Sequence, residues 1–64
     1  MYTYKDLLRD YKNAPSVQEQ HKLLVVHKDI LIYQSAIVQQ KTIADDLQMH
    51  TSKLSNILQI LKVL

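Results

Sequence analysis

The sequence predicts a small all-α domain of three to four helices, and two observations carry this prediction. The 64 residues include no Gly, although average usage is about 7%, and the tight hairpins of small β-sheets depend on Gly. Apolar residues recur at three- and four-residue spacing along most of the chain, which is the period of helices with one buried face. We therefore treat residues 1–64 as a single helical domain, small enough for its stability to be marginal without a partner.

The first helix is expected at about residues 2–12. Its apolar residues fall at i, i+3, i+4 and i+7, and they are Tyr4, Leu7, Leu8 and Tyr11. The sequence Asn-Ala-Pro at 13–15 ends this helix, because Pro cannot continue it. Ser16, followed three residues later by Glu19, has the pattern of a capping box and predicts where the next helix starts.

The second helix is expected to run from 16 to 38. No Gly or Pro interrupts this stretch, so a single helix of about 35 Å is predicted, the alternative being a kink between His27 and Asp29. One apolar stripe follows residues 23, 26, 30, 33 and 37, with 24, 31 and 38 beside it. This apolar face is wider than one packing partner requires, which places the helix at the centre of the domain.

Two shorter helices are expected at 42–48 and 51–63, after a connector at 39–41. Thr42 and Asp45 have the spacing of a capping box, and Asp45 and Asp46 would then lie near the positive end of the helix dipole. The last helix has one apolar stripe suited to burial, formed by Leu54, Ile57, Leu58 and Leu61.

Residues 40–59, QKTIADDLQMHTSKLSNILQ, resemble a DNA-binding helix-turn-helix. The positions that carry the resemblance are Ile43, Ala44, Leu47, Met49, Leu54 and Ile57. A small residue such as Ala44 is needed where the second helix crosses the first. The order DILIYQSAI, KTIADDL and TSKLSNILQILKVL is also similar to the three-helix core of winged-helix regulators, here without a wing after the last helix.

Two positions depart from the helix-turn-helix pattern. Gln48 stands where the family usually has Gly, so the turn is either strained or differently shaped. His50 stands where the second helix usually opens on Ser or Thr, so Thr51 is the first good cap and the helix is expected to start late.

The resemblance implies that the helix from Thr51 enters the major groove of duplex DNA. In helical projection, the side chains pointing away from its buried stripe are Ser52, Ser55, Asn56 and Gln59, which we interpret as base-reading. The residues interpreted as phosphate contacts are Lys41, His50, Thr51, Lys53 and Lys62. The alternative is that these polar side chains are merely solvated.

The same projection leaves Ile60 and Val63 outside the buried set, which predicts a partner interface there. A homodimer is favoured, because two-fold symmetry would place two recognition helices on successive major-groove turns. A larger protein partner is the alternative. A partner would also offset the weak electrostatic attraction of a chain with a net charge of only +2.

Other function classes are disfavoured. The chain has no Cys, and His21 and His27 are six residues apart and so on different helix faces, so no metal site, cofactor or catalytic group is predicted and the protein is not expected to be an enzyme. The N-terminus has no apolar signal segment and no stretch could span a bilayer, so the cytoplasm is the expected location.

We therefore expect a DNA-binding regulator, by analogy of the kind that phages, plasmids and other mobile elements encode. The first alternative is an accessory subunit of a replication or recombination enzyme, which could bind single-stranded DNA. The second is a module that binds or inhibits a protein partner. Four Tyr residues could stack on unpaired bases, but Tyr4, Tyr11 and Tyr33 lie on apolar stripes, where core packing is the favoured interpretation.

Overall fold

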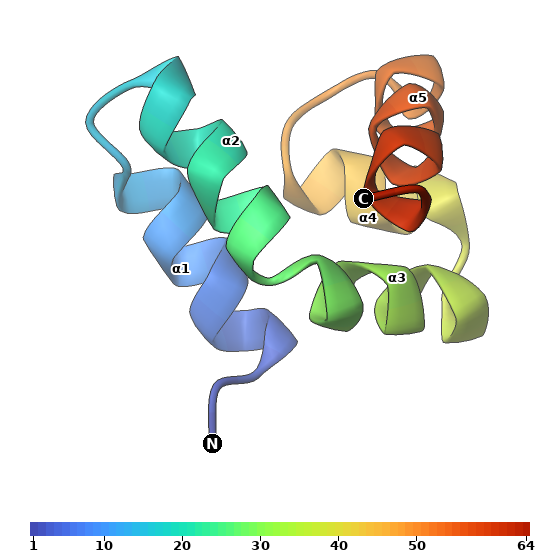
Figure 1. Ribbon diagram of the computed structural model, residues 1–64, viewed down its shortest axis with the longest axis horizontal. Helices are drawn as coiled ribbons and strands as arrows, with labels where there is room; N and C mark the ends of the chain where they lie inside the picture. Colours follow the sequence, from blue (N-terminus) through green and yellow to red (C-terminus); the bar gives the residue numbers. More distant parts are fainter.

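The computed structural model describes all residues, 1–64, and consists of helices joined by short turns, with no strand (Figure 1). The helices are α1 (Tyr4–Asn13), α2 (Val17–Val26), α3 (Lys28–Ile37), α4 (Gln40–Asp46) and α5 (Thr51–Lys62). In Figure 1, α1 and α2 run side by side, while α3, α4 and α5 form the other half of the molecule. The prediction of a small all-α domain is confirmed, with five helices in place of three to four.

The core is built almost entirely from leucines that four of the helices and the turn after α4 bring together. Its buried members are Leu24, Leu31, Ile43, Ala44, Leu47, Leu54, Leu58 and Leu61. Three of these come from α5, so the expected apolar stripe of that helix is confirmed apart from Ile57, which is half-buried. Burial of each leucine contributes about 1.5–3 kcal/mol, and this term holds α5 against α3 and α4.

The prediction of one continuous helix over 16–38 is wrong, and the alternative of a kink between His27 and Asp29 is confirmed, because the chain breaks at His27 between α2 and α3. His27 has φ −109° and ψ 32°, and its amide still donates to the carbonyl of Leu23. A straight helix of about 35 Å would exceed the molecule, whose extents are 25 × 25 × 24 Å. The break lets Leu24 and Leu31 enter the same core from two helix directions.

The beginning of α1 lies two residues later than expected. Thr3 is its N-cap: the Thr3 hydroxyl accepts a hydrogen bond from the Asp6 amide, and the Asp6 carboxylate accepts one from the Thr3 amide at 2.8 Å. Ser16 caps α2 by accepting a hydrogen bond from the amide of Glu19 at 3.3 Å, which confirms the predicted helix start.

The helix expected at 42–48 lies two residues earlier, at Gln40–Asp46, so the predicted cap by Thr42 is wrong. Gln39 is the N-cap and makes no side-chain hydrogen bond. Val38 and Ile43 flank this start and both pack in the core, an arrangement that fixes a helix entry without a polar cap. Asp45 and Asp46 therefore end α4, at the negative end of its dipole and not at the positive end that the sequence predicted.

The tyrosines divide between core and surface. Tyr4 and Tyr11 pack against the core as expected, but the prediction for Tyr33 is wrong, since its side chain is 66% exposed. After the break at His27, Leu31 faces the core, and a residue two positions later points to the opposite side of the helix. Tyr2 stacks on His27 with 3.9 Å between ring centroids, and its hydroxyl donates to Asp10 at 2.6 Å.

Candidate nucleic-acid interface

The packing of α4 against α5 is close because small and apolar side chains meet between the two helices. Ile43 and Ala44 of α4 are 0% and 1% exposed, and Leu54 of α5 is 0% exposed. Ala44 adds little side-chain volume at this contact, so a larger residue there would overpack the core. The sequence-based expectation that residue 44 must be small agrees with this burial.

The turn between α4 and α5 is stabilised by backbone hydrogen bonds around a left-handed residue. Gln48 has φ 58°, the conformation that usually selects Gly. The amide of Gln48 donates to the carbonyl of Asp45 at 3.1 Å, and the amide of Met49 donates to that of Ala44 at 2.9 Å. This pair of bonds is the Schellman pattern that satisfies the last carbonyls of a helix, so the turn keeps the left-handed shape without Gly.

The N-terminus of α5 is capped by a histidine ring in place of a hydroxyl. The Nδ1 atom of His50 accepts a hydrogen bond from the Ser52 amide at 3.2 Å and lies 2.8 Å from the Ser52 hydroxyl. The helix therefore begins at Thr51, the first residue of the expected range 51–63, but its N-cap is His50, so the prediction of Thr51 as the cap is wrong. Because Nδ1 accepts, the proton of the neutral ring lies on Nε2, which remains a donor for another group.

The polar side chains of α5 share the face that turns away from the core. Ser52, Asn56 and Gln59 are exposed and Ser55 is half-buried. None of their side chains has a hydrogen-bond partner in the protein except Ser52, which lies against His50. The helical projection of the sequence thus anticipated which side of α5 is covered and which is free.

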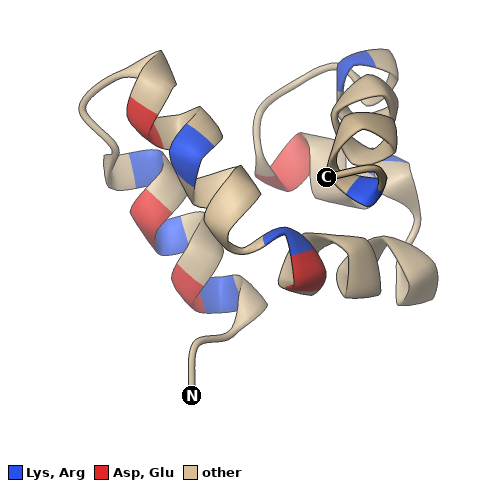
Figure 2. Cartoon of the chain, in the orientation of Figure 1, with Lys and Arg blue, Asp and Glu red and all other residues tan.

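Basic side chains surround this face. Lys53 lies near the beginning of α5 and Lys62 at its end, with no acidic residue between them, and Lys41 lies on α4 (Figure 2). All three are exposed and none forms an ion pair, since the salt bridges of the molecule join Arg9 to Asp6 and Asp10. Thr51 is half-buried in the first turn of α5. The side chains of Lys41, Lys53 and Lys62 thus have no partner within the protein.

Ile60 and Val63, assigned from the sequence to a partner interface, are 59% and 83% exposed. They are three residues apart and so lie on neighbouring positions of the helix surface, Val63 toward the polar face and Ile60 toward α2. Val63 follows Asn56 by seven residues and Gln59 by four, and therefore continues the polar face. Ile60 follows Ile57 by three and points toward α2, where both line a hollow.

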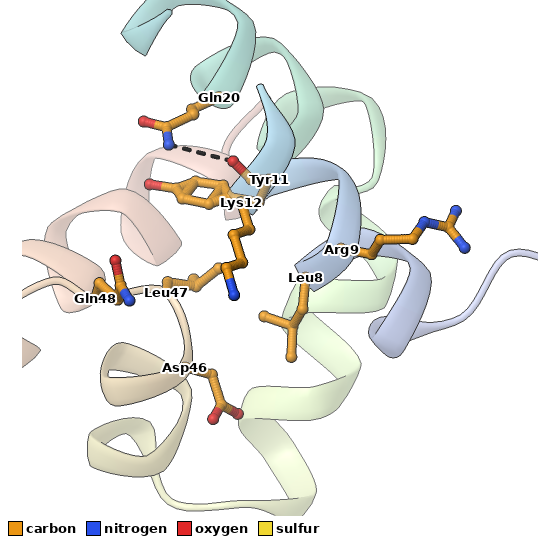
Figure 3. A pocket seen from close by; sticks show the side chains of 8 residues that line it. All are labelled: Leu8, Arg9, Tyr11, Lys12, Gln20, Asp46, Leu47 and Gln48. Atoms are coloured by element: carbon orange, nitrogen blue, oxygen red, sulfur yellow. Dashed lines mark hydrogen bonds between the residues drawn. The ribbon is translucent and has the colours of Figure 1, made fainter. Parts of the chain in front are cut away.

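A hollow of about 250 Å³ lies between α1, α2 and the turn at Gln48, and the sequence did not indicate it (Figure 3). One of its polar side chains has a hydrogen-bond partner, because the Gln20 amide donates to the carbonyl of Tyr11 at 3.2 Å. The side chain of Arg9 extends away from the hollow (Figure 3). The hollow marks the seam between α1 and the α4–α5 turn.

A hydrogen bond between Tyr4 and Asp46 joins α1 to the end of α4. The Tyr4 hydroxyl donates to the Asp46 carboxylate at 3.1 Å, and burial, followed by the negative charge of Asp46, raises the pKa of Tyr4 above its ordinary range. Asp46 gains a partner at a helix end where its charge is otherwise disfavoured. Tyr4 and Asp46 are 42 residues apart in the chain, so no local sequence pattern signals this contact.

The helices are each too short or too polar to traverse a bilayer. No three His, Asp or Glu side chains come together as metal ligands. No protein-family model, no curated protein and no solved structure matches this chain.

Proposed function

We propose that this protein binds duplex DNA through α4 and α5 as a helix-turn-helix, with α5 placed in the major groove. The observation that carries the proposal is the left-handed turn at Gln48, which joins a short helix with a buried Ala44 to a longer helix whose outer face is polar and unpaired.

The outer face of α5 carries hydrogen-bond donors and acceptors suited to contact base edges. Asn and Gln side chains each donate and accept a hydrogen bond, which matches the acceptor and donor that adenine presents in the major groove. Asn56 and Gln59 are exposed, three residues apart, and lie on neighbouring positions of the helix surface. Ser52 and Ser55 are small, so the first turns of α5 can approach the bases closely.

Phosphate contacts would hold α5 in register. Lys53 and Lys62 lie at the two ends of α5 and Lys41 at the beginning of α4, so a duplex whose groove receives α5 can meet cations on both sides. The His50 ring, whose Nδ1 caps α5, offers its Nε2–H to a phosphate oxygen. With a net charge of +2, a single copy would bind weakly at physiological salt. The regulatory role, and an origin in a mobile element, rest on analogy.

The experiment that tests the proposal presents the purified protein with random duplex and random single-stranded oligonucleotide pools at two salt concentrations. We expect selection of a defined duplex sequence that includes adenines, and weaker binding at the higher salt. Enrichment from the single-stranded pool alone would favour the accessory-subunit alternative. No enrichment from either pool would contradict DNA binding and leave the protein-interaction alternative.

A further inference from the structure

A second hollow, of about 110 Å³, lies between α2 and α5, away from the polar face of α5. Its lining is apolar except for one histidine, and consists of His21, Leu24, Val25, Ile57, Ile60 and Leu61. We call it the α2–α5 groove. Leu24 and Leu61 form its buried floor, whereas Val25 and Ile60 form its walls and remain 48% and 59% exposed. The groove is therefore open to an apolar group from outside.

The surroundings of the groove are basic. His21 lines it, Lys22 precedes Val25 by three residues on α2, and Lys53 precedes Ile57 by four on α5. Residues with these spacings are neighbours on a helix surface. Lys28 lies where the two helices end, with its Nζ atom donating to the carbonyl of Leu64 at 2.8 Å. No carboxylate lines the groove, and Asp46 is bonded to Tyr4 of α1.

We propose that the α2–α5 groove binds an acidic amphipathic helix of a protein partner. Two apolar side chains of that helix, spaced i and i+3 or i+4, would lie between Val25 and Ile60. Asp or Glu side chains beside them would meet the basic rim formed by His21, Lys22 and Lys28. This is the helix-in-groove mode of peptide recognition, and charge complementarity selects the partner. The interaction needs no DNA, so it can hold even if the proposed function fails.

A second copy of this chain fits the groove less well. A two-fold contact would bring Lys22 and Lys28 of one copy toward the same cations of the other, and like charges at an interface disfavour association. Val25 and Ile60 are the exposed apolar side chains that line the groove, and two side chains offer far less surface than the about 800 Å² per partner of stable interfaces. The homodimer expected from the sequence would need further surface elsewhere.

The test selects displayed random 12-residue peptides on the immobilised full chain and counter-selects on the Ile60→Asp variant. We expect a consensus that combines two apolar residues at helical spacing with Asp or Glu. The affinity of the selected peptides for the wild type should decrease as the salt concentration rises. Their affinity for the Ile60→Asp variant should be at least tenfold lower than for the wild type. Ile37→Asp is the matched control, because Ile37 is 60% exposed on α3 and does not line the groove; its affinity for the peptides should equal that of the wild type.

A charge-reversal variant keeps the test decisive if Ile60→Asp unfolds. Lys22→Glu leaves the apolar walls intact and should weaken binding of the selected acidic peptides at least threefold. A basic consensus, no consensus, or peptides that bind both variants as well as the wild type would overturn the proposal. Sedimentation of the wild type as a dimer that Ile60→Asp dissociates would assign the groove to a second copy and overturn it as well. Displacement of the peptides by a single-stranded oligonucleotide would assign the groove to nucleic acid, with the same consequence.

Discussion

In α1, several polar side chains bond to one another, whereas on the outer face of α5 the side chains of Asn56 and Gln59 make no hydrogen bond. Asp6 accepts from Thr3 and pairs with Arg9, and Asp10 accepts from both Arg9 and Tyr2. Both helices are amphipathic, and the polar surface of each faces solvent. The difference is that α1 uses its polar groups to fix its own end of the domain, while Asn56 and Gln59 of α5 remain available for another molecule.

The two regions also differ in how their helix ends are fixed. The reciprocal cap of α1 joins Thr3 and Asp6 and is a common local pattern. The ends around the α4–α5 turn depend on a left-handed Gln48 and on the ring of His50, neither of which is a preferred residue for its place. Substitutions at the turn should therefore act on the position of α5 more than substitutions in α1.

The largest expected effect comes from filling the contact between α4 and α5. Ala44→Leu adds volume where the side chain is 1% exposed and should destabilise the protein by about 1–3 kcal/mol, as measured by urea denaturation. Ala36→Leu, on the exposed side of α3, is the control and should change stability little. Wild-type stability of Ala44→Leu would mean that α4 and α5 do not meet at this residue.

Removing the histidine cap should have the next largest effect. His50→Ala deletes the acceptor of the Ser52 amide and should cost about 1 kcal/mol in the free energy of unfolding. Gln39→Ala is the matched control: Gln39 is the N-cap of α4 and makes no side-chain hydrogen bond, so its loss should be nearly neutral. Equal costs for the two variants would contradict the capping role of His50.

Replacing the left-handed residue should act in the opposite direction. Because Gln48 has φ 58°, Gln48→Gly should be neutral or stabilise the protein by up to about 1 kcal/mol. The same substitution inside a helix, at exposed Gln59 in α5 (Gln59→Gly), should destabilise by about 0.5–1 kcal/mol. Thermal denaturation of the two variants separates them, and a destabilised Gln48→Gly would show that the turn is not left-handed in solution.

The smallest effect is the acid sensitivity of the α1 network. The Tyr2 hydroxyl and then Arg9 lower the pKa of Asp10, and the Thr3 amide chiefly lowers the pKa of Asp6. A carboxyl whose pKa is lower in the folded than in the unfolded protein stabilises the fold at any pH above its unfolded-state pKa, near 3.9. This contribution is lost as the pH falls through the folded-state pKa. When the pH is lowered below about 4, the urea concentration at the unfolding midpoint of the wild type should therefore decrease. For Asp10→Asn the midpoint should start lower and fall less, and an equal fall in both proteins would remove Asp10 from the network.

The sequence predicts α5 better than the rest of the chain, for a physical reason. Its apolar stripe repeats with the helical period and meets a single core, so Leu54, Leu58 and Leu61 and the polar face opposite them follow from spacing alone. The sequence offers the break at His27 only as an alternative, because no Gly or Pro marks it; the break lets Leu24 and Leu31 enter one core in a domain about 25 Å across. Tyr33 was misassigned for the same reason, and the Thr42 cap failed because packing of Val38 and Ile43 starts α4 earlier.

The most direct test of the central claim is how well α5 variants discriminate between a selected duplex and a scrambled duplex. Asn56→Ala and Gln59→Ala should each lower this discrimination by about 1–3 kcal/mol without changing stability, because their side chains would read base edges and do not pack. Lys53→Ala is the control: it should weaken binding to both duplexes alike and reduce the salt dependence by about one unit of slope. Equal losses on both duplexes for Asn56→Ala and Gln59→Ala would contradict base reading by α5.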